Sequence, residues 1–429
     1  MGPLTQIVGV GLFQRTVLTL QRAGLRQLIV LAGPEEDQLK QALGKGPRVT
    51  IPVRWMPIRE FPVDDPRTWE ALAAEVRGFC LLSGVGGLFS RPLIEQLRHD
   101  VKEGQAIVVS YGRRGHGKRQ ARGGTSSISF EPGGTGLADL VVLPAALMGT
   151  SGLAATGQDS APVQWWLDRV SKDGRVRVMR ANVDPTQWYQ SVNQPGDLSA
   201  AERKLYGSLK SEFEGIIDRY FNRRLSRWFT RAFLALGLSP NAITIVATIV
   251  GLTAAMAFSL GSYGAGLLAA LLFQLAAVID CCDGEVARLT FTESPFGAWL
   301  DIAMDNVVHM AIFGGIAAGA YVRASGAEQA WVPLALGAAA IFGNVVSFLL
   351  VNRAQKVKQA SEWKTPVHAA WSDFMLKNVA SRDFTVVVLA FALLGKLDLF
   401  LWIAAIGSSA FALIMVWVVR PSAVVAMRS

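Results

Sequence analysis

Six apolar stretches, nearly free of charged residues, follow one another between residues 241 and 419. Most of them have about 20 residues, the length that a helix needs to cross the hydrocarbon core of a bilayer. They predict six transmembrane helices, over residues 242–260, 264–280, 299–321, 331–351, 384–394 and 399–419. We therefore expect an all-α membrane domain over residues 241–429, of which the fifth span is the shortest.

Basic residues are concentrated on one side of these predicted spans. They precede the first span and fill the connection between the fourth and the fifth, as Arg219, Arg223, Arg224, Arg227, Arg231, Lys356, Lys358, Lys364, Lys377 and Arg382. The loops on the other side carry only Arg323 and Lys396. Loops rich in basic residues stay cytoplasmic and contact anionic lipid. We expect a multi-pass protein of the cell (inner) membrane with both termini in the cytoplasm, and we attribute the net charge of +9 to the bilayer rather than to nucleic acid.

The first 200 residues have the mixed composition of a soluble domain. Strand and helix patterns alternate there: helices over 16–23, 35–43, 69–76 and 92–102, and strands over 27–32, 49–56, 78–83, 106–110 and 138–143. Such alternation predicts an α/β sheet with helices on both faces. Residues 1–20 have no secretory signal pattern, and the three cysteines are expected to be small apolar filler without a disulfide framework.

Residues 201–240 connect the two parts. Within them, residues 214–236 interleave apolar residues with arginines at helical spacing, which predicts an amphipathic helix lying in the membrane interface. The pattern ends at Gly237. Either Ser239 or Asn241 would then cap the first span, around Pro240.

Four aspartates stand where the second and third spans meet. Asp280 and Asp283 are three residues apart, and Asp301 and Asp305 are four apart, so each pair would face one way on a helix. Four converging acids at membrane depth repel one another unless a cation neutralises them. Oxygen ligands suit Mg²⁺ or Mn²⁺, and a pair of such ions would bind a pyrophosphate and leave one carboxylate as a base. The alternatives are capping salt bridges or a cation path.

These residues resemble a known sequence signature. Eight specified residues over 26 positions match that of the CDP-alcohol phosphotransferase family, as Asp280-x2-Asp283-Gly284-x2-Ala287-Arg288-x8-Gly297-x3-Asp301-x3-Asp305. The resemblance implies a six-helix membrane enzyme, usually a homodimer, which transfers a phosphoalcohol from a CDP-alcohol donor to an alcohol acceptor and releases CMP. Its site would open to the cytoplasm.

The resemblance also assigns roles to individual residues. Asp280, Asp283 and Asp301 would be metal ligands, and Asp305 the general base with a second role at the second metal. The residues implied to lie near the nucleotide are Asn241, Thr244, Gly284, Ala287, Arg288 and Gly297.

The resemblance extends to a fused subfamily that joins a nucleotidyltransferase domain to the membrane transferase, known from inositol-1-phosphate cytidylyltransferase with di-myo-inositol-phosphate-phosphate synthase. Asp184-Pro185 and residues 218–223 are similar to its junction, and residues 11–33 to the segment after its nucleotide loop. The glycine-rich loop itself is expected before the point where this chain begins, and Val85 stands where the subfamily has a metal-binding aspartate. Residues 1–200 are therefore interpreted as a degenerate nucleotidyltransferase-like domain.

Basic residues near the predicted pocket are candidates for an acceptor phosphate, which would be an inositol or polyol phosphate by the fusion resemblance. They are Arg223, Arg353, Lys356 and Arg382. Each is also placed to contact lipid headgroups. His309 lies one turn after Asp305, where it would tune the base or simply pack. Two rival functions are a membrane transporter with a cytoplasm-facing acidic cation site, and a noncatalytic partner protein.

Overall fold

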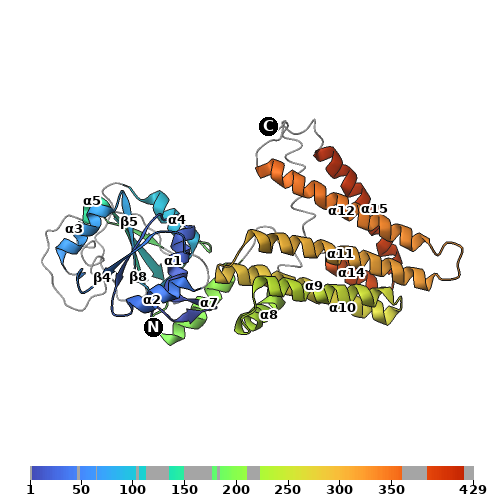
Figure 1. Ribbon diagram of the computed structural model, residues 1–429, viewed down its shortest axis with the longest axis horizontal. Helices are drawn as coiled ribbons and strands as arrows, with labels where there is room; N and C mark the ends of the chain where they lie inside the picture. The colour runs from blue at the N-terminus through green and yellow to red at the C-terminus, as the bar shows by residue number, and fades with distance from the viewer. Residues whose placement is uncertain are drawn as a thin grey trace. The chain divides into compact units, whose positions relative to one another are not determined.

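The structure, a computed structural model, is shown in Figure 1. It describes residues 2–45, 49–63, 65–102, 106–112, 135–148, 176–180, 184–209, 223–359 and 384–419. The chain divides into two compact units, Met1–Leu209 with Leu289–Phe291, and Lys210–Arg288 with Thr292–Ser429.

The first unit contains the alternating strands and helices that the sequence predicts. Its elements are β1 (Gln6–Ile7), β2 (Val10–Gly11), α1 (Leu12–Arg22), β3 (Leu28–Ala32), α2 (Glu36–Gly44), β4 (Val53–Pro57), α3 (Pro66–Glu75), β5 (Phe79–Ser83), β6 (Gly87–Phe89), α4 (Arg91–Asp100), β7 (Ala106–Gly112), β8 (Thr135–Pro144), α5 (Ala145–Met148), β9 (Val176–Arg180), β10 (Tyr189–Ser191), the 3-10 helix Pro195–Asp197 and α7 (Leu198–Gly207). The main sheet has the order β5-β8-β7-β9, with β8 antiparallel to both neighbours and β9 parallel to β7. A separate parallel pair joins β3 to β4.

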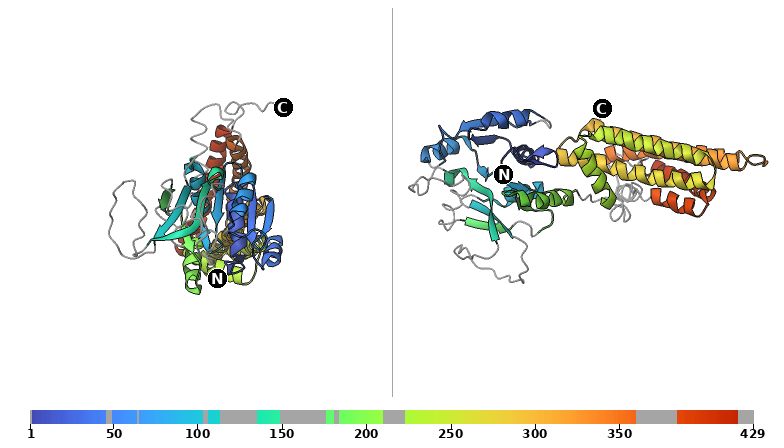
Figure 2. Two further views of the ribbon diagram at one scale, coloured as in Figure 1. Left: turned by 90° about the vertical axis from the view of Figure 1, so that its left-hand side faces the viewer. Right: turned by 90° about the horizontal axis from the view of Figure 1, so that it is seen from below.

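Helices cover both faces of this sheet, as expected, and Figure 2 shows it from two further sides. Side chains alternate along a strand, so neighbouring residues of β7 enter different cores. Ile107 and Val109 pack with α1 and α4, whereas Ala106 and Val108 pack with α3 and α5. The α/β fold of this unit follows from two apolar cores that share one sheet.

The second unit is helical. Its elements are α8 (Arg223–Ala235), α9 (Pro240–Ser259), α10 (Tyr263–Thr290), α11 (Pro295–Arg323), α12 (Val332–Gln359), α14 (Phe384–Leu393) and α15 (Leu397–Val418). Among the described residues, five of these helices are long and apolar enough to cross a membrane: α9, α10, α11, α12 and α15. The predicted fifth span appears as α14, which has only ten described residues. Five of the six expected spans are thus present at full length.

Helix α8 is the described part of the helix expected over 214–236, and its position in the membrane interface stays a prediction. Ser226 and Thr230 point inward and are fully buried, while Trp228 is 74% exposed on the opposite face. The next helix begins at Pro240, and the hydroxyl of Ser239 accepts a hydrogen bond from the Ala242 amide at 3.3 Å. Of the two predicted capping residues, Ser239 is therefore the cap.

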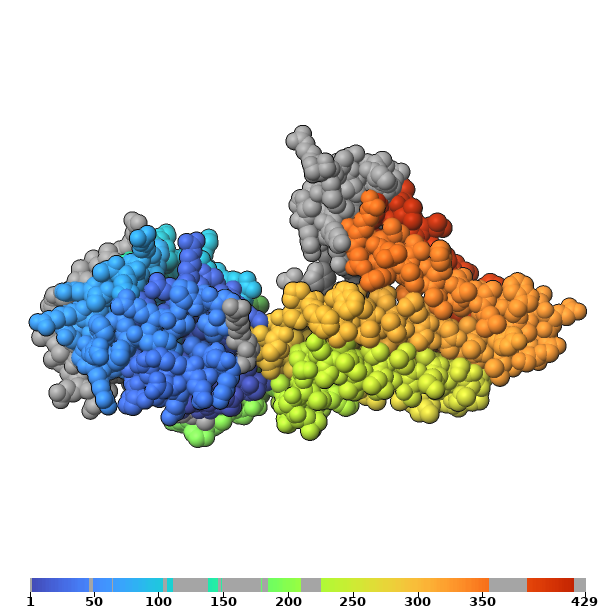
Figure 3. Space-filling view, viewed as in Figure 1, coloured from blue at the N-terminus to red at the C-terminus, as the bar shows by residue number. Residues whose placement is uncertain are grey.

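Small residues allow α9 and α11 to pack closely, and Figure 3 shows the two helices in contact. A Cβ added to Gly315 would lie 2.2 Å from the carbonyl oxygen of Ala255, and one added to Gly319 would lie 2.2 Å from that of Phe258. Inside a bilayer the hydrophobic effect does not drive helices together, so transmembrane helices associate through close van der Waals contacts of this kind. The backbones of α9 and α11 therefore approach one another where glycine permits it.

We predict that Gly315→Ala destabilises the membrane domain. The new methyl group would meet a backbone carbonyl, so the helices must separate, at a cost of roughly 1–3 kcal/mol. The thermal midpoint of the purified protein in detergent should fall by several degrees. Gly407→Ala on α15 is the matched control, because nothing lies within 4 Å of its added Cβ. An equal midpoint for both variants would contradict close packing at Gly315.

Candidate functional site

A tight turn joins the two helices that carry the aspartate pairs. Helix α10 continues unbroken to Thr290, about ten residues beyond the predicted end of its span, and α11 begins at Pro295. Phe291 adopts a left-handed conformation with φ of 61°, and the Thr292 amide donates to the carbonyl of Ala287 at 3.0 Å. The Ser294 hydroxyl caps α11 by accepting from the Gly297 amide at 2.9 Å. The chain thus reverses within a few residues.

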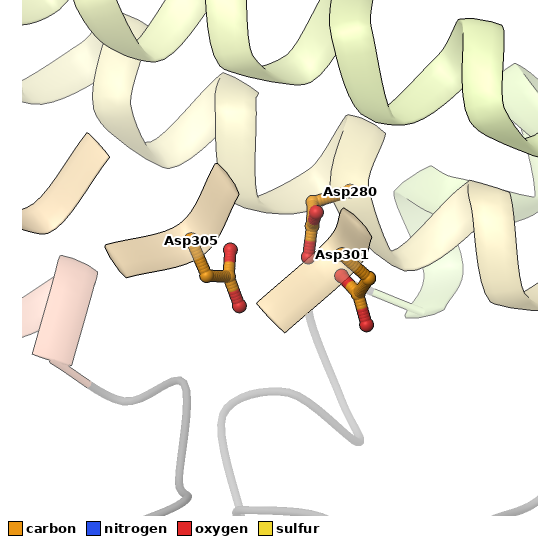
Figure 4. Close-up of side chains that lie close together, drawn as sticks. All are labelled: Asp280, Asp301 and Asp305. Carbon is orange, nitrogen blue, oxygen red and sulfur yellow. The ribbon is translucent and has the colours of Figure 1, made fainter. Parts of the chain in front are cut away.

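Three carboxylates from these helices converge, as Figure 4 shows. Asp280 of α10 and Asp301 and Asp305 of α11 each offer an oxygen, and these oxygens lie within 4.8 Å of one another. Asp280 is buried, and the other two are half-buried. Carboxylate oxygens are the donors that hard divalent cations prefer, and a cation would remove the repulsion among the three charges. The donor set therefore fits Mg²⁺ or Mn²⁺.

The fourth aspartate, Asp283, has a different environment. It is buried in α10, 7% exposed, and its carboxylate accepts a hydrogen bond from the hydroxyl of Thr244 in α9. It is not among the three acids whose oxygens converge. The structure brings together three of the four predicted metal ligands and shows that Thr244, predicted near the nucleotide, contacts Asp283.

The remaining residues predicted near the nucleotide surround the same turn. Gly297 lies beside Asn241, since an added Cβ would be 3.1 Å from Asn241 Oδ1. Gly284 lies beside Arg288, with 3.3 Å from such a Cβ to the guanidinium. Arg288 is exposed, and Ala287 is buried. The starts of α9 and α11 are thereby adjacent to the signature segment of α10.

The predicted acceptor residues are placed less fully. Arg353 is exposed on α12. Arg223 and Lys356 lie in α8 and α12, but their side chains are outside the described part of the structure, as is the whole of Arg382. Their contact with an acceptor phosphate stays a prediction.

A cavity of about 480 Å³ adjoins the carboxylates. Asp280 and Asp305 contribute to its wall, and other lining residues come from α9, α11, α12 and α14. Its further polar residues are Thr248, Asn306, His309, Asn344 and Thr385. A cavity lined by acids and by amide, hydroxyl and imidazole groups can hold a polar substrate beside the acid cluster.

Two polar contacts define that wall. The Asn344 amide donates to Asn306 Oδ1 at 3.4 Å, and the Thr385 hydroxyl donates to Gln274 Oε1 at 2.8 Å. These residues were missed by the sequence reasoning. A signal was present, because a polar residue inside an otherwise apolar span generally faces the protein interior.

His309 was anticipated near Asp305. It packs edge-on against Phe273 and Phe384, with ring centroids 6.1 and 5.5 Å apart. Of the two roles expected for His309, the structure shows the packing role.

Glu285 was missed as well, because the signature leaves its position open. It is 3% exposed and accepts hydrogen bonds from Ser226 and Thr230 of α8.

In the first unit, Val85 follows β5. Its side chain packs against the apolar cluster of Phe13, Val17 and Leu39. Asp139 of β8 lies beside the neighbouring glycine, since a Cβ added to Gly84 would be 2.9 Å from Asp139 Cβ. Burial raises the pKa of Asp139. The position that the resemblance gives to a metal-binding aspartate is occupied by an apolar contact.

Comparison with known proteins identifies the second unit. Residues 237–427 match the family model described as CDP-alcohol phosphatidyltransferase. The "Bifunctional IPC transferase and DIPP synthase" of Rubrobacter xylanophilus is 28% identical over 90% of this chain and 85% of its own length. The "Archaetidylinositol phosphate synthase" of Pyrococcus horikoshii is 34% identical over 22% of this chain and 48% of its own length.

Among solved structures, the chain is similar to phosphatidylinositol phosphate synthase of Mycobacterium tuberculosis in complex with manganese and citrate. That match has a TM-score of 0.31 and 18% identity, and it covers 46% of this chain and 89% of the other. The family match contains all eight signature residues, including the three converging aspartates. Residues 237–427 of this chain therefore form a domain that matches the CDP-alcohol phosphatidyltransferase family, a family of phosphotransferases.

Proposed function

We propose that the acceptor of this transferase is an inositol phosphate or another polyol phosphate, and that it reacts with the CDP-alcohol at a site formed by Asp280, Asp301 and Asp305. The acceptor oxygen attacks the β-phosphorus of the CDP-alcohol, the bond from that phosphorus to the CMP oxygen breaks, and CMP leaves. The convergence of the three carboxylates beside a polar cavity is the observation that supports this site.

The three aspartates would hold divalent metal together with Asp283, the fourth ligand that the family resemblance implies. When bound, such ions neutralise the pyrophosphate and stabilise the charge on the departing CMP. Asp305 would accept the proton of the attacking hydroxyl, since it lies in the cavity wall as well as in the acid cluster. Asp280 and Asp301, on two helices, fix where that chemistry occurs.

The acceptor class is supported by the relatives and by the cavity. One of the two relatives is named archaetidylinositol phosphate synthase, and the relative from Rubrobacter matches both units of this chain. A polyol has many hydroxyls, and Asn306, His309 and Asn344 supply the hydrogen-bonding groups that such a molecule needs. The phosphate of the acceptor would be held by the predicted basic residues Arg223, Arg353, Lys356 and Arg382.

The membrane placement extends the same proposal. We expect a homodimer in the cell (inner) membrane, with the acid cluster and the first unit on the cytoplasmic side. The basic residues that flank the spans support this orientation.

For the proposed function, the first prediction concerns the acid cluster. Asp301→Asn and Asp305→Asn should each reduce CMP release at least a hundredfold, because each removes a charge that the metal or the proton transfer requires. CMP release from CDP-inositol and CDP-diacylglycerol, against free and phosphorylated alcohols, measures it. Asp398→Asn is the control, since Asp398 pairs with Arg323 and is 62% exposed. Wild-type turnover by Asp305→Asn would remove Asp305 from its role as base.

The second prediction concerns the metal. Removal of divalent ions by a chelator should abolish CMP release, and Mg²⁺ or Mn²⁺ should restore it, because three close carboxylates hold substrate phosphates only with a cation between them. Titration of each ion into the chelated enzyme measures the effect. Full activity after exhaustive chelation would contradict a metal-dependent reaction.

The third prediction concerns the first unit, which we propose to be a degenerate nucleotidyltransferase domain. With CTP and inositol 1-phosphate the full chain should release no pyrophosphate above background, since Val85 makes an apolar contact where a metal ligand is required. A coupled pyrophosphate assay measures this. Pyrophosphate release above background would contradict the prediction and would mean that this unit is catalytic. Asp139→Asn would then test whether Asp139 supplies the required acid.

A further inference from the structure

Glu285 is a buried acid that the reaction proposed above does not use. It stands in α10 between Gly284 and Ala287 and is 3% exposed. Both oxygens of its carboxylate accept hydrogen bonds from α8: one from the Ser226 hydroxyl at 3.0 Å, the other from the Thr230 hydroxyl at 2.7 Å. Both hydroxyl residues are fully buried. A buried charge is costly unless it is hydrogen-bonded, so these two contacts are needed for Glu285 to be there.

The two hydroxyls belong to one face of α8. Ser226 and Thr230 are four residues apart, so they lie one turn from each other on the helix. The same side of α8 carries Phe229 and Phe233, which pack on an apolar cluster that contains Ile279 of α10. In addition, the Cys282 thiol donates to the carbonyl of Ser226 at 3.5 Å. Helix α8 is thus attached directly to the signature segment.

The apolar contacts and the hydrogen bonds contribute differently. Apolar burial is non-directional and tolerates small sliding of one helix along another. Two hydrogen bonds from successive turns to one carboxylate tolerate much less, because each is limited in distance and angle. The contacts of Glu285 therefore restrict both the sliding of α10 along its axis and its rotation about that axis, relative to α8.

The signature segment is held at a second point nearby. Asp283 accepts a hydrogen bond from Thr244 of α9, two residues before Glu285. Asp280 lies on the same continuous helix, five residues before Glu285, so roughly 7–8 Å of helical rise separates the two residues. A displacement of α10 at Glu285 would move Asp280 relative to Asp301 and Asp305, which are carried by α11.

We propose that Glu285 is a positioning residue: with Ser226 and Thr230 it fixes α10 so that Asp280 remains within reach of Asp301 and Asp305. The inference rests on the proposed metal site. It gives α8 a function beyond lying at the membrane surface, because this helix sets the geometry of the acid cluster through a single carboxylate.

The experiment compares two substitutions of Glu285. Glu285→Gln keeps both contacts, because one hydroxyl can donate to the amide oxygen while the other accepts from the amide nitrogen. Glu285→Leu removes both. The double variant Ser226→Ala with Thr230→Val removes the same contacts from the side of α8. For each purified variant, Mn²⁺ binding without substrate is measured by calorimetry, together with kcat and KM for CMP release and the thermal midpoint.

Support of an acid cluster by neighbouring residues typically changes metal affinity about 10- to 100-fold, so Glu285→Leu and the double variant should bind Mn²⁺ at least tenfold more weakly and lose kcat. Glu285→Gln should stay within about threefold of the wild type, since its contacts persist. Thr253→Val on α9 is the matched control, because its exposed hydroxyl donates only within its own helix, to the carbonyl of Ile249.

Several outcomes would overturn the proposal. Glu285→Leu or the double variant with unchanged Mn²⁺ affinity and kcat, whatever its thermal midpoint, would leave Glu285 with a role in stability alone. A loss in Glu285→Gln as large as in Glu285→Leu would show that the charge, rather than the contacts, is required. If Glu285→Leu does not fold, the double variant decides. If the wild type releases no CMP, the proposed function fails, whereas the Mn²⁺ measurements still test Glu285.

Discussion

Repulsion among three carboxylates is the constraint on which the membrane unit depends. The oxygens of Asp280, Asp301 and Asp305 converge within 4.8 Å, with Asp280 buried and the other two half-buried. Like charges at such distances oppose one another strongly, and more so as the local dielectric constant falls. The arrangement is useful only if the helices that carry the acids cannot move apart and if a cation balances the charge. The first requirement can be recognised in the surrounding structure.

The rigidity has identifiable sources. Glycines of α11 meet the backbone of α9, so these two helices approach closely along one face. A tight turn through Phe291 joins α10 to α11, and the Ser294 cap fixes where α11 begins. Hydrogen bonds to Asp283 and Glu285 then attach α10 to α9 and α8. Each acid of the cluster is thereby held by a helix that is itself held elsewhere, which is the condition for a preorganised metal site.

The two units differ at the positions that the sequence resemblance implies to be catalytic. In the membrane unit every residue of the signature is present, and three of its acids meet. In the α/β unit the apolar side chain of Val85 packs into a core where the family resemblance would place an acid. A sheet fold can persist through such a change, because its stability comes from the apolar cores on both faces and not from a single loop residue.

The sequence by itself determined much of this protein. Apolar stretches near 20 residues predicted the membrane helices, since a bilayer imposes that length. Alternation of strand and helix patterns predicted the α/β unit, and the spacing of the aspartates predicted a shared acidic site. Tertiary structure decided the rest, because spacing along a helix does not say which neighbouring helix supplies a partner. In the folded protein Asp283 binds Thr244 and lies apart from the three acids that converge. Ser239 caps the first span, and Asn306 and Asn344, from different helices, line the cavity together. Tertiary structure also placed Glu285 against Ser226, 59 residues away, a contact that depends on how α8 and α10 pack and that no local pattern in the sequence encodes.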